Sequence, residues 1–146
     1  MRLNEKIELL AALPLLGLLE HEALHVLAFT ARERRLRAGE ELFHRDEKAD
    51  CGYLILSGRI ALSAHGSDLA AAPQFGPGAL LGETALIAET TRPATAIAIE
   101  PSSVLVLPRD LMHRVLEEHP GSAATLRRRV AATVAATEFE LKTVLD

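Results

Sequence analysis

The sequence predicts a mainly β protein flanked by helices, an α+β fold in which short strands form a sandwich or barrel-like roll. Three observations support this prediction. Short apolar or alternating stretches, separated by turn residues, recur between residues 32 and 108, as is typical of antiparallel sandwiches and rolls. Helical periodicity is confined to the two ends of the chain, residues 1–31 and 109–146. The 146 residues, 49% of them apolar, suit a single domain with a hydrophobic core.

Two helices are expected at the N-terminal end. Asn4 is the predicted N-cap of the first, whose apolar residues recur at helical spacing until Pro14 ends the pattern. Residues 15–19 form an apolar connector that we expect to be packed rather than exposed. Residues 20–31 then predict a second helix with one apolar face, formed by Leu24, Leu27 and Ala28.

The second helix contains a pattern typical of zinc peptidases. His21 and His25 lie four residues apart with Glu22 between them, which would place both imidazoles on one helix face. The extended pattern needs glycine and histidine where this chain has Ala28 and Ala31, so a third ligand is missing. We therefore interpret the two histidines as solvated side chains and keep a zinc peptidase as an alternative function.

The middle of the chain predicts strands and turns. Residues 53–56 and 59–63, joined by the turn residues Ser57-Gly58, predict a hairpin. Residues 45–50 are a charged loop, and residues 38–40 are a turn. The remaining predicted strands cover residues 32–37, whose charges indicate a solvated edge, and residues 41–44, 94–99 and 103–107.

Two helices are expected after the strands. Residues 109–119 predict one with Leu111, Val115 and Leu116 facing inward, and His119-Pro120-Gly121 ends it. Ser122 is the predicted cap of a final helix that reaches the end of the chain. Its apolar residues recur every three or four positions, so we expect the first half to pack on the roll and the second half to support a homodimer. The seam consists of Leu126, Val130, Val134, Thr137, Leu141 and Leu145.

Composition and charge exclude several classes of function. The net charge of −4 and the low aromatic content of 3% argue against direct nucleic-acid binding. No apolar stretch reaches 18 residues, so we expect no membrane insertion, and the first residues do not predict a signal peptide. The lone Cys51 excludes an internal disulfide, is expected to be a buried small hydrophobe, and fits a cytoplasmic location. No spacing indicates a nucleophilic catalytic site, so we expect no enzyme.

Residues 75–95 contain the chemistry on which the functional prediction depends. Gly82, Glu83 and the short helix expected at residues 84–88 would place free backbone N–H groups at one point, which suits an anion. Arg92 follows the acid by nine residues and can donate two parallel hydrogen bonds to a phosphate. Glu83 would accept from sugar hydroxyls, so a ligand with both groups would use both side chains. The alternative is a plain loop salt bridge between Glu83 and Arg92.

This stretch resembles the phosphate-binding cassette of cyclic nucleotide-binding domains. The resemblance is carried by Gly82-Glu83-Thr84-Ala85-Leu86-Ile87, a gap of four residues, and Arg92-Pro93-Ala94-Thr95. The family includes catabolite-activator-type transcription factors, regulatory subunits of cyclic AMP-dependent kinase and nucleotide-gated channels. The similarity extends in order and spacing over residues 10–135 and includes Arg37–Glu40, Tyr53–Arg59, Gly76–Gly78 and Val104–Leu107.

The resemblance implies a double-stranded, jelly-roll-like β-roll with N-terminal helices and two C-terminal helices. It implies one domain, residues 1–146, with N-terminal helices at 1–31, the roll at 32–108, the cassette at 80–95 and lid helices at 109–146. Glu83 would hold the ribose 2′-hydroxyl and Arg92 the exocyclic phosphate oxygens, with backbone N–H groups completing the cradle. The implied ligand-binding residues are Leu81, Gly82, Glu83, Thr84, Arg92, Pro93, Ala94 and Thr95.

Two residues depart from the family pattern. Pro93 stands where many members have alanine, serine or threonine, and proline offers neither a backbone N–H nor a hydroxyl. Because relatives that prefer cyclic GMP often have threonine or serine there, we expect cyclic AMP as the ligand, with cyclic GMP possible. Asp46 stands where relatives commonly have glycine, and aspartate tolerates the left-handed backbone region better than most residues, so we expect the turn to be kept.

The predicted function is therefore a cyclic nucleotide-binding regulatory module for signal transduction, without a further cofactor. Movement of the C-terminal helices would transmit the signal to a protein effector that the sequence does not identify. The alternatives are a nucleotide-blind interaction or dimerisation module on the same fold, or the N-terminal sensor fragment of a transcription regulator.

Overall fold

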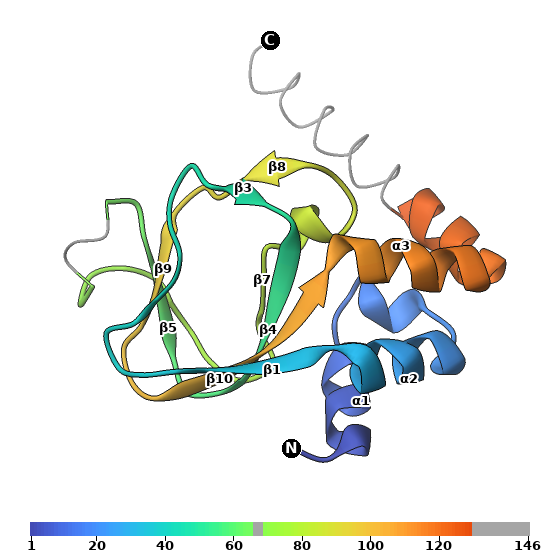
Figure 1. Cartoon of the computed structure of the whole chain (residues 1–146), viewed down its shortest axis with the longest axis horizontal. Coiled ribbons are helices and arrows are strands. Elements are labelled where there is room, and N and C mark those ends of the chain that lie inside the picture. Colours follow the sequence, from blue (N-terminus) through green and yellow to red (C-terminus); the bar gives the residue numbers. More distant parts are fainter. Residues whose placement is uncertain (66–68, 130–146) are drawn as a thin grey trace, which may run out of the picture.

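The computed structural model describes residues 1–65 and 69–129, and it has the predicted architecture of a β-roll flanked by helices (Figure 1). One antiparallel sheet has the order β1 (Arg32–Leu36), β10 (Ser102–Pro108), β4 (Cys51–Ser57) and β7 (Leu80–Leu81). The other has the order β2 (Glu41–Phe43), β9 (Thr95–Ala98), β5 (Ile60–Ser63) and β6 (Gln74–Phe75). A two-stranded ribbon pairs β3 (Lys48–Ala49) with β8 (Thr90–Thr91).

The helices gather beside the first of these sheets, on the side away from β5 and β9 (Figure 1). They are α1 (Leu3–Ala11), α2 (His21–Thr30) and α3 (Arg109–Glu118), and residues 120–129 are also helical. The 3-10 turn η1 (Leu16–Leu18) lies between α1 and α2. A second 3-10 turn, η2 (Thr84–Leu86), follows β7. The predicted fold class, with N-terminal helices and two C-terminal helices, is confirmed.

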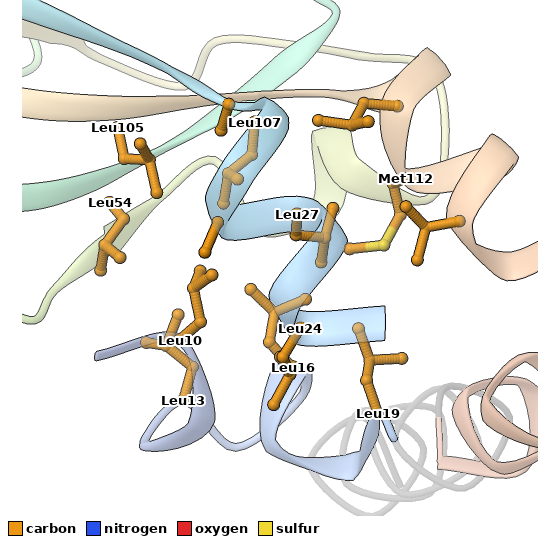
Figure 2. Packing of buried hydrophobic residues seen from close by; sticks show 14 of the residues in the cluster. Leu10, Leu13, Leu16, Leu19, Leu24, Leu27, Leu54, Leu105, Leu107 and Met112 are labelled. Atoms are coloured by element: carbon orange, nitrogen blue, oxygen red, sulfur yellow. The ribbon is translucent and has the colours of Figure 1, made fainter. Parts of the chain in front are cut away.

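The central strands β4 and β10 of the first sheet are buried on both faces, which explains their continuous apolar sequences, whereas the charged edge strand β1 is largely exposed. Successive side chains of a strand point to opposite faces. In β4, Leu54 and Leu56 therefore join the cluster under the helices, whereas Tyr53 and Ile55 join the cluster inside the roll. Figure 2 shows leucines of the N-terminal helical region meeting Leu54, Leu105 and Leu107 of the sheet and Met112 of α3.

The predicted hairpin between residues 53–56 and 59–63 is wrong. β4 pairs with β10 and β7, whereas β5 pairs with β9 and β6, so the two strands belong to different sheets. Gly58, with a φ of 89°, turns the chain from one sheet into the other. The hydroxyl of Ser102 accepts a hydrogen bond from the Arg59 N–H at 3.1 Å and holds this corner. Pairing with β9 and β6, which lie further along the chain, therefore decides which sheet β5 joins.

Several helix details also differ from the predictions. α1 begins at Leu3 with Arg2 as its N-cap, so Asn4 lies inside the helix rather than capping it. The N–H of the N-cap residue Arg2 donates to a Glu5 carboxylate oxygen at 3.4 Å, the contact that the third helical residue makes in a capping box. In α3, Met112 is fully buried, whereas Leu116 is only half-buried.

Ser122 does not cap the final helix, which already begins at residue 120. Its buried hydroxyl instead accepts a hydrogen bond from the Glu20 N–H at 2.9 Å, at the start of α2. This contact ties the second C-terminal helix to the N-terminal helices. The rest of the predicted dimer seam, from Val130 onward, lies outside the described residues.

Four strands of two residues each, β3, β6, β7 and β8, escaped the sequence prediction. β3 lies inside the stretch expected to be a charged loop. Segments of two residues are too short to show an alternating pattern in the sequence. They form strands because neighbouring strands supply their hydrogen-bond partners. Within residues 1–65 and 69–129, no helix combines the length and apolar character needed to cross a membrane.

Candidate functional site

A pocket of about 300 Å³ opens beside the stretch that follows β7. Two short segments, residues 81–85 and 90–94, form most of its lining. Its remaining walls come from strands far away in the sequence, through Phe43, Ala49 and Leu62. The candidate residues that line it are Leu81, Gly82, Glu83, Thr84, Arg92, Pro93 and Ala94.

Thr95, the remaining candidate, does not line the pocket. Its side chain is only 2% exposed, and its hydroxyl accepts a hydrogen bond from the Arg45 N–H at 3.0 Å. It therefore fixes the loop after β2 against the start of β9. Phe43, Ala49 and Leu62 were missed as pocket residues because they are ordinary apolar strand residues that no local motif distinguishes.

The Arg92 side chain lies at the inner end of this pocket and is 3% exposed. Its Nη2 donates to the Cys51 carbonyl oxygen at 2.8 Å and lies 3.5 Å from the Cys51 sulfur. Its Nη1 is buried and has no hydrogen-bond partner. One edge of the guanidinium is therefore fixed to the protein, while the other keeps unused donors.

Gly82 makes room for the guanidinium. Its φ of 81° lies in the left-handed region that glycine adopts without strain. A Cβ at this position would overlap Arg92 Nη1 and would lie 3.2 Å from the Cys51 carbonyl oxygen. Only glycine therefore satisfies both the backbone turn and the space beside Arg92.

The backbone of Arg92 is fixed by the loop that follows β2. Its N–H donates to the Glu47 carbonyl at 2.8 Å, and its carbonyl accepts from the Asp46 N–H at 2.9 Å. Asp46 has a φ of 73°, so the predicted left-handed turn at this aspartate is confirmed. The β3–β8 ribbon continues this pairing and holds the arginine over the roll.

Arg92 and Glu83 do not form the loop salt bridge that the sequence left open. In the described part of the chain, Arg92 has no carboxylate partner, and Glu83 is exposed at the start of η2. Burying an unpaired cation is costly, because water no longer solvates the charge. A site of this kind is therefore suited to an anion that approaches Nη1.

Neither of the nearby acidic groups supplies that anion near neutral pH. Burial raises the pKa of the Cys51 thiol. Burial, followed by a hydrogen bond with Cys51, raises the pKa of the Tyr53 hydroxyl to about 12. Both groups therefore stay protonated and neutral around Arg92 at neutral pH.

Arg109, at the first position of α3, connects that helix to the edge of the site. Its Nη1 donates to the carbonyl oxygens of Ala49, Ala85 and Ala88 at 3.0, 3.2 and 3.1 Å. Its backbone N–H donates to the Asp50 carbonyl at 2.8 Å. One side chain therefore joins β3, η2 and α3. A movement of η2 would displace the first residue of α3 through these hydrogen bonds.

A larger pocket of about 660 Å³ adjoins this junction at Ala88. It is mainly apolar and is bounded by the segment after η2, by α3 and by the helical residues 120–129. It contains no buried unpaired polar atom comparable with Arg92 Nη1 among the described residues. Its lining consists of Ile87, Ala88, His113, Leu116, Glu117, Ala123, Leu126 and Arg127.

The zinc-peptidase pattern on α2 does not form a metal site in the described part of the chain. His21, Glu22 and His25 are all exposed. Across residues 1–65 and 69–129, no three histidine, cysteine, aspartate or glutamate side chains are grouped so that they would hold a metal ion. The structure thus adds no third ligand to the two histidines.

The roll, the Gly-Glu turn and the buried arginine are suited to a domain that binds an anionic ligand, and comparison with known proteins agrees. The family model described as "Cyclic nucleotide-binding domain" matches residues 33–119, more than half of the chain. The chain belongs to the cyclic nucleotide-binding domain family. Domains of this family are generally regulatory rather than catalytic.

Two solved structures are similar to this chain. A cyclic nucleotide-binding-like protein from Brucella abortus is 39% identical, with a TM-score of 0.70 over 77% of this chain and 98% of that one. The N-terminal domain of a transcriptional regulator from Streptomyces coelicolor is 27% identical, with a TM-score of 0.78 over 91% of this chain and 94% of that one.

Curated relatives are much longer. Lysophospholipase nte1 of Neosartorya fischeri is 32% identical over 119 residues, which is 80% of this chain but 8% of the relative. The protein of the same name from Aspergillus oryzae is 31% identical over 119 residues, with the same shares of the two chains. The match therefore concerns a small part of those proteins.

Proposed function

We propose that this chain binds a cyclic nucleotide, cyclic AMP in preference to cyclic GMP, and acts as a regulatory sensor module. The observation that supports this most strongly is the buried Arg92 guanidinium, whose Nη1 has no partner and faces Gly82. A cyclic phosphate supplies the missing anion, and its two exocyclic oxygens suit a guanidinium edge.

In this proposal Glu83 and Arg92 divide the ligand between them. Glu83 is exposed at the mouth of the pocket and has no ion-pair partner in the described part of the chain, so its carboxylate is available to a ribose 2′-hydroxyl. Arg92 lies deeper and takes the phosphate. A ligand with a free hydroxyl close to a phosphate uses both side chains, whereas inorganic phosphate uses only Arg92.

Binding is proposed to act on the C-terminal helices through Arg109. Its bonds to the carbonyls of Ala85 and Ala88 link the segment that contacts the ligand to the first turn of α3. Ligand shifts such an equilibrium only by its preference for one arrangement. Amide hydrogen exchange across α3 and residues 120–129, with and without nucleotide, tests this. The same exchange pattern in both states would exclude signalling by these helices.

Calorimetric titration with cyclic AMP and cyclic GMP tests the binding itself. We expect micromolar binding that weakens at least ~100-fold in Arg92→Ala, since a buried charge pair is lost. Arg37→Ala, which removes an exposed arginine outside the pocket, is the matched control and should bind as the parent does. Absence of heat and of thermal stabilisation with both nucleotides would refute the proposal and favour a nucleotide-blind interaction module.

The preference for cyclic AMP depends on Pro93, which lines the pocket and offers no donor. Replacing it with threonine adds a hydroxyl and a backbone N–H next to Arg92. We expect Pro93→Thr to raise the affinity for cyclic GMP relative to cyclic AMP. An unchanged ratio of the two dissociation constants would contradict this assignment.

The names of two similar proteins support a proposal about what such a module controls. Similar stretches form the N-terminal domain of a protein titled a transcriptional regulator and a small part of proteins named lysophospholipases. We propose that the domain regulates a protein effector, either within a longer chain or in a complex. Self-association through the last helix is part of the same proposal, although that seam lies outside the described residues from Val130 onward.

A further inference from the structure

Two aromatic rings from different sheets lie against the Arg92 guanidinium. Arg92 Cζ is 4.5 Å from the ring centroid of Phe43, at the end of β2. It is 5.3 Å from the ring centroid of Tyr53, in β4. The two rings are stacked with centroids 5.9 Å apart and planes 22° apart, and both side chains are buried. The cation therefore lies over a joint aromatic surface contributed by both halves of the roll.

We propose that Phe43 and Tyr53 are positioning residues that hold Arg92 ready for a phosphate before the ligand arrives. The inference rests on the proposed function, since it assigns these rings a role in the same binding event. A free arginine side chain has many rotamers, and ordering it at binding weakens affinity. Aromatic faces attract a guanidinium electrostatically, most strongly where water is excluded.

The contacts around Arg92 fix its orientation as well as its position. The rings lie against the guanidinium, and the Cys51 carbonyl holds Nη2 at 2.8 Å. Nη1 is then directed to the space beside Gly82, where it has no partner. The Nη1 edge of the guanidinium is therefore held in a defined position. No carboxylate of the described residues is paired with this edge, so none competes with the phosphate for it.

Ordinary core packing is the competing explanation, because both rings also belong to the apolar cluster inside the roll. Replacing a ring with leucine distinguishes the two, since leucine stays apolar but has no aromatic face. The chain provides a matched control in Phe75, which packs against the same cluster without a ring contact to Arg92. Tyr53→Phe provides a second control, because it keeps the ring and removes only the hydroxyl.

The first experiment measures the dissociation constant for cyclic AMP by calorimetry in these variants. We expect Phe43→Leu and Tyr53→Leu each to weaken binding about 10-fold, the effect of a desolvated cation–π contact. Tyr53→Phe and Phe75→Leu should stay within about twofold of the parent, as controls that keep the Arg92 contacts. Circular dichroism establishes that each variant is folded. If Phe43→Leu does not fold, the comparison of Tyr53→Leu with Tyr53→Phe decides the outcome.

The second experiment examines the ligand-free protein by nuclear magnetic resonance. The guanidinium signals of Arg92 should show ring-current shifts and slow rotation about the Cζ–Nη bonds, both reduced in Phe43→Leu. An averaged, unshifted Arg92 signal like that of exposed Arg37 would overturn the inference, as would unchanged affinity in both leucine variants. If the signals are shifted and slow but no nucleotide binds, the proposed function fails while the positioning of the cation stands.

Discussion

Replacing Gly82 with alanine should damage both the fold and the binding site, for two separable reasons. Alanine in the left-handed region costs about 1–2 kcal/mol. The new Cβ would also overlap Arg92 Nη1 and press on the Cys51 carbonyl oxygen at 3.2 Å, and overpacking of a buried site costs a further 1–3 kcal/mol or so. We therefore expect a total loss of about 2–5 kcal/mol of unfolding free energy.

Gly39 provides the matched control. Its φ of 87° is nearly the same as that of Gly82, but a Cβ there would meet nothing within 4 Å. Gly39→Ala should therefore lose only the backbone part, about 1–2 kcal/mol. The difference between the losses of unfolding free energy in the two variants measures the steric cost of the Cβ beside Arg92.

Urea unfolding followed by circular dichroism gives these free energies, since the chain has no tryptophan to report by fluorescence. Titration with cyclic AMP gives the second readout, in which Gly82→Ala should bind at least ~10-fold more weakly while Gly39→Ala binds normally. The reasoning would be refuted if the two variants lost the same free energy and both bound nucleotide as the parent does.

Three further variants test contacts elsewhere in the fold. Arg109→Met removes donors to three carbonyls and should lower the unfolding free energy by about 2–3 kcal/mol in urea, whereas the exposed Arg114→Met should not. Ser122→Ala leaves the Glu20 N–H without its partner and should cost about 1–3 kcal/mol; a loss near zero would show that this contact does not hold the helices together. For Tyr53, burial raises the pKa to about 12, so the unfolded state releases its proton first as the pH rises. Its contribution is complete below pH 10 and declines between about pH 10 and 12, by up to about 3 kcal/mol. Tyr53→Phe should flatten this alkaline loss, and an equal loss in both proteins would contradict the assignment.

Local patterns in the sequence were enough to predict the class of fold. Short strands separated by glycine and proline turns, with helices at both ends, indicated a roll because these patterns depend on neighbouring residues. The left-handed turn at Asp46 was predicted from the family resemblance, because relatives commonly have glycine there, and its φ of 73° confirms it. The predicted hairpin failed because adjacent strands need not pair, and β5 pairs instead with β9 and β6, which lie further along the chain.

The candidate site likewise contains residues that the sequence predicted and residues that only the structure identified. The residues from Gly82 to Ala94 were recognisable because glycine, acid and arginine occur at a fixed spacing within one stretch. Phe43, Tyr53 and the Cys51 carbonyl had no such signal, since they are ordinary strand atoms until the fold brings them to Arg92.

The sequence by itself determined that this chain forms a helix-flanked roll with an arginine available for an anion. Only the tertiary structure decided that this arginine is buried, lacks a carboxylate partner and lies over two aromatic rings. The physical reason is that turns and periodicity are encoded by neighbouring residues, whereas the surroundings of a charge are set by packing. The Arg92–Cys51 hydrogen bond, which joins residues 41 positions apart, exists only once both sheets are in place.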